Sequence, residues 1–588
     1  MGMPPVLGAG WRGRPLPAAN GRGTNPPPSN VYKSDEELRN CSSTGNAVET
    51  SGTTSRNQKF ATVIRHYMKQ KKLKAATENV HQRCINGCSG EPHARRLAGP
   101  DRGFSSQRYA HSQSMRTVAV LGGGVGGLAA SYYLCRSPQV TKVILIESSS
   151  RFGGWLRSTR RPDSAVFEQG PRGIRPAGAV GQNTLNMVDD LGLGREVLPV
   201  PYSHVASKNR FLYVNGRLNR MPSGLRGLLR TIPPFSRPLL YSVASEVLVK
   251  KSKEDDESVH SFVSRRLGQE LADLAVDSLC RGVFAGDCRK LSVRSCFPPL
   301  FKAEQQRGSL TLGMLLGSGP SQTVTPGSLA KRAKKESWAQ WSLRGGVETL
   351  PESIVEYLQR SGKVELQKNA PVKSMSHSEL GWKIELEDGV VSADHIISAL
   401  PSKALACVLP PSCQSLTRLL QDIHAVTVAV VNLEYDGSIL PVQGFGHLLP
   451  SSEDKGLLGV VYDSVPFPEH NRPNGETTRL TVMMGGSWFQ EEFGDPDSVS
   501  SESLLKQACE AVSSQLGVKA APIWSLVSLH RDCIPQYYLG HYQRVESMRS
   551  FIRSRNLPLS LVGSSFDGVS VNDVIFSGRA AVEELFGL

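Results

Sequence analysis

The chain has 588 residues, of which 39% are hydrophobic and 21% are charged, so it is long enough for two or three domains with sizeable cores. Its formal net charge is +15, but residues 1–114 hold 17 Lys and Arg against 7 Asp and Glu, which leaves the rest of the chain with about +5. This balance argues against a nucleic-acid partner for the main part of the chain, and no apolar run approaches the roughly 18 residues needed to span a bilayer.

The eleven cysteines are scattered along the chain, and none of them forms a Cys-x-x-Cys pair. Cys84 and Cys88 have no matching second pair, and the chain lacks a His-Glu-x-x-His motif, so we predict no metal site. Reduced, buried thiols are the simplest interpretation of the cysteines.

Residues 1–114 are rich in Pro, Gly, Ser, Asn and basic residues with almost no apolar periodicity, so we predict a disordered basic N-terminal extension. Residues 61–80 could form a basic helix within it. Basic, serine-rich character is typical of a mitochondrial transit segment, although the acids at 33–38 fit such a segment poorly. The alternative is that Met115 is a natural start and that the upstream residues are dispensable.

Residues 115–204 alternate strands and helices and are predicted to begin a dinucleotide-binding domain. Two parallel buried strands, at 117–122 and 142–148, flank a helix at 126–136. The turn between the first strand and the helix has the motif Gly-x-Gly-x-x-Gly. Its first glycine allows the tight turn, the second lets the backbone approach a pyrophosphate, and the third lets helix and strand pack closely.

The residues that follow this motif indicate which dinucleotide binds. Glu147 ends the second strand, 20 residues beyond Gly127, where a carboxylate can accept hydrogen bonds from a ribose 2′-hydroxyl and disfavours NADP. Arg151 and the pair Gly153–Gly154 extend the pattern to Glu-x-x-x-Arg-x-Gly-Gly, and residues 167–173 add another glycine loop. A large planar flavin needs several such close approaches of the backbone, so we predict FAD rather than NAD.

The alternation is interrupted twice after residue 204. Residues 205–322 interleave Leu, Ile, Phe and Tyr with Arg, which predicts a helical domain resting in an anionic lipid interface or, alternatively, packed in a dimer or domain contact. Strand–helix character returns at 323–418, residues 419–555 are predicted to form a sheet-rich substrate-binding domain, and residues 556–588 return to the nucleotide-binding domain. The predicted fold is therefore α/β with α+β inserts: a Rossmann-like FAD-binding domain interrupted by a helical membrane-binding insert and a sheet-rich substrate domain.

The Glu-x-x-x-Arg-x-Gly-Gly pattern after the first glycine motif resembles the flavin-dependent amine oxidase superfamily. In that superfamily a final G…V…ND…SG segment also returns to the flavin, and residues 568–578 match it. The resemblance implies that the adenine contacts the chain at Val372 and that the flavin lies along the terminal segment. The implied cofactor-binding residues are Gly122, Gly123, Gly124, Val125, Gly126, Gly127, Glu147, Ser148, Trp155, Gly170, Pro171, Arg172, Gly173, Val372, Val569, Ser570 and Val571.

Further stretches narrow the resemblance: "RFGGWLRS", "FEQGPRGIRPAG", "DSLCRGVFAGD", "LPVQGFGHLLPSSED" and "CIPQYYLGH" are similar to the oxygen-dependent protoporphyrinogen oxidases of the animal mitochondrial type. This similarity implies a six-electron oxidation of protoporphyrinogen IX to protoporphyrin IX, the penultimate step of haem biosynthesis. Hydride would pass to FAD in three turns, and O₂ would be reduced to hydrogen peroxide. It also implies a homodimer held peripherally at the intermembrane-space side of the mitochondrial inner membrane, with handover of the product to ferrochelatase.

The same resemblance implies the substrate site and leaves the electron chemistry to the cofactor, with no catalytic protein nucleophile and no metal. Arg210 would pair with a propionate of the substrate, since a guanidinium suits a carboxylate; otherwise it is a surface arginine beside a strand. The apolar walls and the close approach of the macrocycle would come from Gly282, Phe445, Gly446, Leu448 and Met483, for which ordinary core packing is the alternative.

Two other functions stay open at this point. Another enzyme of the flavin amine oxidase type, such as a polyamine oxidase or a carotenoid desaturase, would share the cofactor motifs. A flavin-fold carrier without turnover would share them too, because cofactor binding and catalysis are separate properties.

Overall fold

The structure, a computed structural model, describes residues 117–316 and 324–587. The predicted extension at 1–114, with its transit-segment and dispensable-extension interpretations, lies outside the described residues. Within the described ranges, no helix is both long and apolar enough to cross a bilayer.

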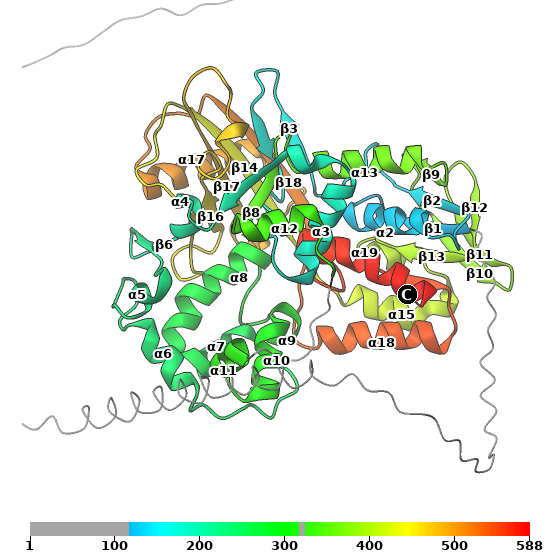
Figure 1. Cartoon of the computed structure of the whole chain (residues 1–588), viewed down its shortest axis with the longest axis horizontal. Helices are drawn as coiled ribbons and strands as arrows, with labels where there is room; N and C mark the ends of the chain where they lie inside the picture. Colours follow the sequence, from blue (N-terminus) through cyan, green and yellow to red (C-terminus); the bar gives the residue numbers. More distant parts are fainter. Residues whose placement is uncertain (1–116, 317–323, 588) are drawn as a thin grey trace, which may run out of the picture. The chain divides into compact units, whose positions relative to one another are not determined.

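Five parallel strands form the sheet that carries the first glycine motif (Figure 1). Their order is β19-β13-β1-β2-β9, and their bounds are β1 (Thr117–Leu121), β2 (Lys142–Ile146), β9 (Val364–Gln367), β13 (His395–Ser398) and β19 (Leu559–Leu561). Segments far apart in the sequence thus meet in one sheet. This confirms the predicted α/β fold whose nucleotide-binding domain is interrupted by two inserts.

Side chains alternate between two buried faces along these strands, as expected for a sheet covered on both sides. In β1, Val118 and Val120 face one layer while Ala119 and Leu121 face the other, and all four are 0% exposed. The first layer contains α2 (Val125–Arg136), α3 (Gly178–Asp190), α12 (Ser328–Lys335), α13 (Thr349–Arg360) and α19 (Val571–Phe586). The second contains the antiparallel strands β10 (Ser374–Ser378), β11 (Gly381–Glu385) and β12 (Val390–Ala393) with helices α14 (Ser402–Val408), α15 (Gln414–Gln421) and α18 (His541–Ser554).

A second sheet has seven strands, antiparallel except where β15 pairs with β6. In order they are β18 (Trp524–Pro535), β14 (Ala425–Asp436), β17 (Thr477–Gly486), β16 (Leu457–Val461), β15 (Gly446–Leu448), β6 (Phe211–Val214) and β7 (Arg217–Arg220). Helices α16 (Phe489–Phe493) and α17 (Ser501–Leu516) pack in its core. The shorter elements are β3 (Ser158–Arg160), β4 (Val166–Glu168), η1 (Leu193–Arg195), β5 (Val197–Pro201), α4 (Val205–Lys208), β8 (Trp338–Leu343), η3 (Pro411–Cys413) and η4 (Pro468–His470).

Two predicted domain boundaries need correction. The helical domain predicted at 205–322 includes β6 and β7, but Leu212 of β6 pairs with Leu448 of β15, so this hairpin extends the seven-stranded sheet. The substrate domain predicted at 419–555 includes α18, but Val545 and Met548 pack beneath the parallel sheet. In both cases the tertiary partner, which no local pattern reveals, decides where the element belongs.

The helices of the insert are α5 (Gly224–Leu228), α6 (Leu239–Glu246), α7 (Val259–Leu267), the π-helical η2 (Leu271–Val276), α8 (Asp277–Phe284), α9 (Val293–Cys296), α10 (Pro298–Arg307) and α11 (Leu310–Leu316). A buried arginine joins them: Arg266 forms ion pairs with Glu246 and Glu304. Glu246 also accepts hydrogen bonds from the N–H groups of Leu310 and Thr311 at the start of α11. Because buried charges are costly unless they are paired, this network fixes how α6, α7, α10 and α11 pack.

Buried charged residues also join the β3–β4 region to the seven-stranded sheet. Arg172 forms an ion pair with Asp463 at 2.8 Å, and Arg479 of β17 donates to the carbonyl of Val166 in β4 at 2.9 Å. Glu168 accepts hydrogen bonds from the N–H of Val347 and the hydroxyl of Ser158, both at 2.8 Å. Burial nevertheless dominates and raises the pKa of Glu168 to about 7.

Titration of Glu168 should make stability depend on pH. The folded state binds the proton more tightly than the unfolded chain, so the free energy of unfolding should fall as the pH rises from 4.5 to about 7, by about 3 kcal/mol. Chemical denaturation at pH 5 and pH 7.5 measures this loss. Glu168→Gln should remove it, and the exposed control Glu387→Gln should keep it; an unchanged loss in the Glu168 variant would contradict the assignment.

Candidate active site

Two glycines of the first glycine motif have different roles: Gly127 allows close packing, and Gly124 leaves space for a ligand. A Cβ added at Gly127 would lie 1.9 Å from the carbonyl oxygen of Gly122, so only glycine lets α2 pack this closely on β1. At Gly124 a Cβ would meet only the Cα of Gly154, at 4.0 Å. The space beside Gly124 is therefore open to a ligand, whereas the space beside Gly127 is filled by the protein itself.

The N-terminus of α2 opens onto this space. Gly124 is its N-cap residue and supplies no side-chain hydrogen bond, and the first turn has no acidic residue. The first N–H groups of a helix have no partner within the helix, and they carry the positive end of its dipole. An anion such as a pyrophosphate satisfies both features.

Glu147 is held at the end of β2 by the same motif. Its Oε2 accepts from the N–H of Gly123 at 2.7 Å, and its Oε1 accepts from the N–H of Ser149 at 2.8 Å. The carbonyl of Glu147 accepts from the N–H of Ala370 at 3.0 Å, which brings the segment of Val372 beside it. The predicted ribose and adenine residues therefore lie together, with Ser148 exposed next to them.

The second glycine pair is held by a residue that the predicted contact set omits. Arg151 donates to the carbonyls of Phe152 and Gly154 and forms an ion pair with Glu348 at 3.0 Å. The N–H of Gly153 donates to the carbonyl of Gly123 at 2.8 Å, which ties the two glycine loops together. The signal for Arg151 was its place in the Glu-x-x-x-Arg-x-Gly-Gly pattern.

The loop at 170–173 packs against Trp155, which directly follows the second glycine pair. A Cβ at Gly170 would lie 2.4 Å from the carbonyl oxygen of Trp155, whose side chain is 46% exposed and rests edge-on against His530. The guanidinium of Arg172 is engaged with Asp463, while Pro171 is exposed. The side chain of Arg172, predicted to bind the cofactor, is thus engaged within the protein, and any direct contact from this loop falls to its backbone and to Gly173.

The terminal helix closes the site. Ser570 is the N-cap of α19 and accepts from the N–H of Asp573 at 3.2 Å, with Val569 and Val571 half-buried on either side. Because the carboxyl ends of parallel strands meet at one edge, the residues after β13 and β19 also reach the first glycine turn. The carbonyl of Ala399 lies 3.1 Å from a Cβ built at Gly122, and Gly563 has open space at its Cβ position. Their places after buried strands of the parallel sheet were the available signal for both residues, which the predicted set omits.

The apolar substrate residues come together in one wall. Leu448 of β15 pairs with Gly459 of β16, which in turn pairs with Met483 of β17. A Cβ at Gly282 of α8 would lie 2.8 Å from the side chain of Leu448, so this helix lies directly against the sheet. At Gly446, with φ +146°, a Cβ would lie 2.3 Å from the carbonyl oxygen of Val460, which explains the glycine by backbone packing.

Arg210 and Phe445 adjoin this wall. The N–H of Phe445 donates to the carbonyl of Asn209 at 3.0 Å, which places Arg210 at the next residue. Burial lowers the pKa of Arg210, and the nearby charge of Arg175 lowers it further. No acidic partner for Arg210 is present among the described residues.

Two apolar residues of α8 complete the wall and were missed by the sequence reasoning. Leu279 is 38% exposed and Val283 is 44% exposed, although both are apolar and belong to a helix with buried neighbours. Leu279 lies three residues before Gly282 and four residues before Val283, so the two exposed side chains share one side of α8 next to Gly282. Helical spacing around Gly282 was the available signal.

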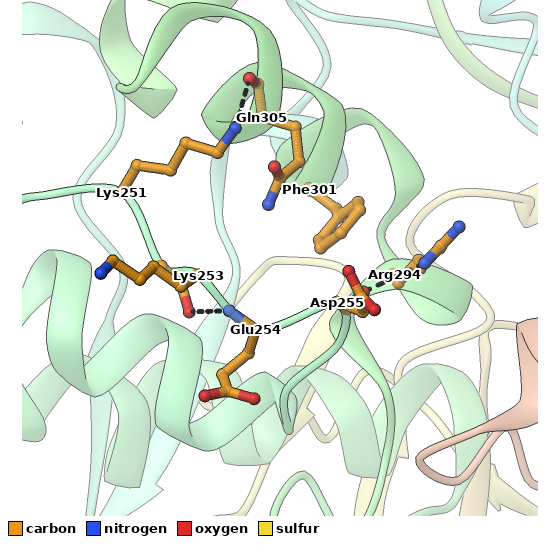
Figure 2. A pocket seen from close by; sticks show the side chains of 8 residues that line it. Lys251, Lys253, Glu254, Asp255, Arg294, Phe301 and Gln305 are labelled. Carbon is orange, nitrogen blue, oxygen red and sulfur yellow. Dashed lines mark hydrogen bonds between the residues drawn. The ribbon is translucent and has the colours of Figure 1, made fainter.

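Two other features of the described chain do not belong to this site. A cavity of about 560 Å³ in the helical insert has mixed charges from Lys251, Lys253, Glu254, Asp255 and Arg294, and none of the glycine loops lines it (Figure 2). In it, the Nζ of Lys251 already donates to the carbonyl of Gln305 at 3.0 Å.

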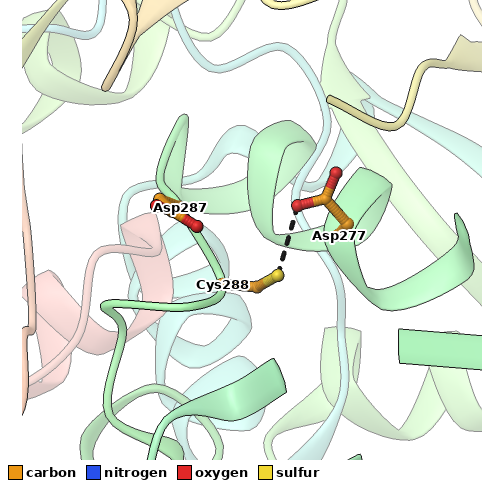
Figure 3. Close-up of side chains that lie close together, drawn as sticks. All are labelled: Asp277, Asp287 and Cys288. Atoms are coloured by element: carbon orange, nitrogen blue, oxygen red, sulfur yellow. Dashed lines mark hydrogen bonds between the residues drawn. The ribbon is translucent and has the colours of Figure 1, made fainter. Parts of the chain in front are cut away.

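The second feature is a group of Asp277, Asp287 and Cys288 side chains (Figure 3). Buried Asp277 accepts from the thiol of Cys288 at 3.2 Å and from the N–H of Ser451 at 2.6 Å. Burial raises the pKa of the Cys288 thiol. These side chains are accounted for by hydrogen bonds within the protein.

The comparisons with known proteins agree with this geometry. The pattern of the flavin containing amine oxidoreductases matches residues 125–586. The protoporphyrinogen oxidase of Homo sapiens is 54% identical over 475 residues, which cover 80% of this chain and 98% of the human protein. The chain belongs to the flavin-containing amine oxidoreductases and, among them, to the protoporphyrinogen oxidases.

More distant protoporphyrinogen oxidase relatives extend the comparison. The coproporphyrinogen III oxidase of Bacillus subtilis is 28% identical over 491 residues, covering 80% of this chain and 98% of the bacterial protein. A crystal structure from Exiguobacterium sp. 255-15 has a TM-score of 0.62 at 22% identity, covering 80% of this chain and 98% of that one, and it supports the fold alone.

The cofactor is FAD, and the residues of this chain fit that group. The open space at Gly124 and the uncapped start of α2 suit the pyrophosphate. Glu147 suits the ribose, and the loop at 170–173 with the N-terminus of α19 suits the ring system. These four segments come from both ends of the described chain, so the site exists only in the folded protein.

Replacing Gly124 by Val should abolish flavin retention without unfolding the protein. The protein leaves room for a side chain at this position, so the added methyl groups would occupy the pyrophosphate space. Flavin absorbance of the purified protein measures retention, and far-UV circular dichroism measures folding. Gly127→Val is the matched comparison and should destabilise the fold itself; a yellow, fully loaded Gly124 variant would contradict the assignment.

Proposed function

We propose that this enzyme oxidises protoporphyrinogen IX to protoporphyrin IX with O₂ as the electron acceptor and hydrogen peroxide as the second product, the penultimate step of haem biosynthesis. The observation that most supports this proposal is that Arg210, which has no acidic partner among the described residues, adjoins an apolar wall beside the FAD loops. This arrangement suits a flat, apolar dicarboxylate. The 54% identity to the human protoporphyrinogen oxidase supports the same substrate.

The chain's own residues bind and orient the macrocycle. Arg210 would fix a propionate through charge-assisted hydrogen bonds, while Phe445 and Leu448 would cover the faces of the ring. Gly282 would let α8 lie close against Leu448, so that the helix and the strand together form the apolar wall beside the macrocycle. When bound, FAD supplies a two-electron acceptor that O₂ can reoxidise, so three turns account for six electrons.

A polyamine oxidase or a carotenoid desaturase is the second candidate of the same class. Amine oxidation would favour carboxylates or an aromatic cage beside the flavin, whereas the wall formed by Gly282, Leu448 and Met483 is apolar and its polar neighbour is Arg210. A flavin-fold carrier without turnover shares the cofactor residues and differs only in lacking electron transfer.

Anaerobic reduction of the flavin separates these functions. Each protoporphyrinogen gives up six electrons and each flavin accepts two, so one third of an equivalent of protoporphyrinogen per flavin should bleach the flavin. The loss of the flavin absorption band at about 450 nm measures this, and fluorescent protoporphyrin should remain. Polyamines under the same conditions should leave the band unchanged. Bleaching by polyamines alone would identify an amine oxidase, and a band unchanged by either compound would identify a carrier.

We also propose that the helical insert attaches the enzyme peripherally to the mitochondrial inner membrane on the intermembrane-space side. The support is a set of exposed apolar side chains in a segment that also contains Arg226 and Arg230, which form no ion pair within the described part of the chain, as expected at an anionic lipid surface. These apolar residues are Leu229 (59% exposed), Tyr241 (62%), Leu248 (86%), Met314 (68%), Leu315 (57%) and Leu316 (53%). A homodimer and handover of the product to ferrochelatase are further proposals drawn from the family resemblance.

The double variant Leu248→Glu, Leu315→Glu should weaken binding to anionic vesicles at least tenfold, because each leucine would contribute about 1.5 to 3 kcal/mol on burial. Co-sedimentation with vesicles measures the binding, and flavin content checks the fold. Leu380→Glu is the control, since Leu380 is 91% exposed but lies in the turn between β10 and β11. Equal vesicle binding by the double variant and the control would count against membrane attachment through this insert.

A further inference from the structure

Two arginines near the apolar wall have no partner for their guanidinium groups among the described residues. Arg210 precedes β6, and Arg175 follows the glycine loop at 170–173; both reach solvent, although the surrounding protein partly desolvates the guanidinium of Arg210. Most other arginines of the site are engaged: Arg172 pairs with Asp463, and Arg151 pairs with Glu348. Two neighbouring cations repel each other. An anionic ligand that binds between or beside them offsets this repulsion.

A continuous set of contacts places Arg175 near Arg210. A Cβ at Gly173, two residues before Arg175, would lie 3.7 Å from the ring of Phe467. Phe467 and Phe445 pack in the same apolar cluster, and the N–H of Phe445 donates to the carbonyl of Asn209, next to Arg210. The effect of the Arg175 charge on the pKa of Arg210 agrees with this proximity.

The backbone of Arg175 is fixed at the cofactor end of the site. Its carbonyl accepts from the side-chain amide of Asn572 at 2.8 Å, and Asn572 lies in the first turn of α19. The adjacent Ile174 forms a backbone bridge with Trp341 of β8. Arg175 is therefore an exposed side chain on a rigid backbone, between the flavin-binding helix end and the apolar wall.

We propose that Arg175 is a second carboxylate anchor that acts together with Arg210, so that the enzyme selects a porphyrinogen with two neighbouring propionates. This inference rests on the proposed function. In protoporphyrinogen IX the two propionates leave adjacent pyrroles on one side of the ring, which matches one guanidinium for each carboxylate. A porphyrinogen with four propionates would place its two additional carboxylates against the apolar wall, where they would be desolvated without a partner.

Equilibrium binding of the fluorescent product tests this assignment without turnover. Flavin-loaded wild type, Arg175→Gln, Arg210→Gln and the double variant are titrated with protoporphyrin IX and with its dimethyl ester in the same detergent buffer. Each single variant should bind protoporphyrin about tenfold more weakly, and the double variant about a hundredfold, since each loses one charge-assisted interaction. The dimethyl ester should bind all four proteins about equally.

Two matched variants separate an anchor from a structural residue. Arg175→Lys keeps the charge and should recover part of the lost affinity. Arg195→Gln removes another exposed arginine, in η1, whose guanidinium has no ion pair in the described structure, and should bind like wild type. Unchanged flavin absorbance in Arg175→Gln would show that the cofactor site is intact.

The outcomes distinguish this inference from the function on which it rests. If protoporphyrinogen bleaches the wild-type flavin but Arg175→Gln binds protoporphyrin as tightly as Arg195→Gln, the second anchor is wrong and the proposed function stands. If Arg175→Gln and Arg175→Lys both lose the flavin, the residue is structural and the anchor is also wrong. A wild type that neither bleaches nor binds protoporphyrin would overturn the proposed function and this inference with it.

Discussion

The close approach of α2 to β1 at Gly127 is the contact on which the site depends. With no side chain at this position, the helix begins directly above the first strand, and its unpartnered N–H groups point at the open space beside Gly124. Arg151 then holds the second glycine pair against the same space. The open space beside Gly124 is therefore bordered by backbone, which suits a pyrophosphate, and the other candidate cofactor residues come from neighbouring segments.

Buried charged residues connect the candidate cofactor loops to the apolar wall. The Arg172–Asp463 pair joins a flavin loop to the seven-stranded sheet, and Arg479 joins that sheet to β4. Leu448 and Met483 stand on the same sheet, so the apolar wall and the FAD loops are held by one rigid connection. Arg175 and Arg210 lie where the loop and the sheet meet. The distance between the candidate cofactor loops and the apolar wall is thus set by how the two sheets pack.

Local patterns in the sequence mark the candidate cofactor residues more clearly than they mark the domain boundaries. The glycine motif, Glu147 and the final segment carry local patterns, because backbone approach to a cofactor requires particular residues at fixed spacing. The β6–β7 hairpin and α18 carry no such pattern, and only their tertiary partners assign them. Strand ends and helical spacing offered a signal for Leu279, Val283, Ala399 and Gly563, but their place in the site depends on segments distant in the sequence. The substrate residues came from a family resemblance, and the structure shows that they adjoin.

A crystal structure of the FAD-loaded protein with bound protoporphyrin is the most direct test of this arrangement. The account predicts the pyrophosphate within hydrogen-bonding distance of the first N–H groups of α2. It also predicts the flavin ring between the loop at 170–173 and the start of α19, with the macrocycle against Leu448 and its carboxylates toward Arg210 and Arg175. A flavin bound away from Gly124, or a macrocycle whose carboxylates point away from both arginines, would contradict it.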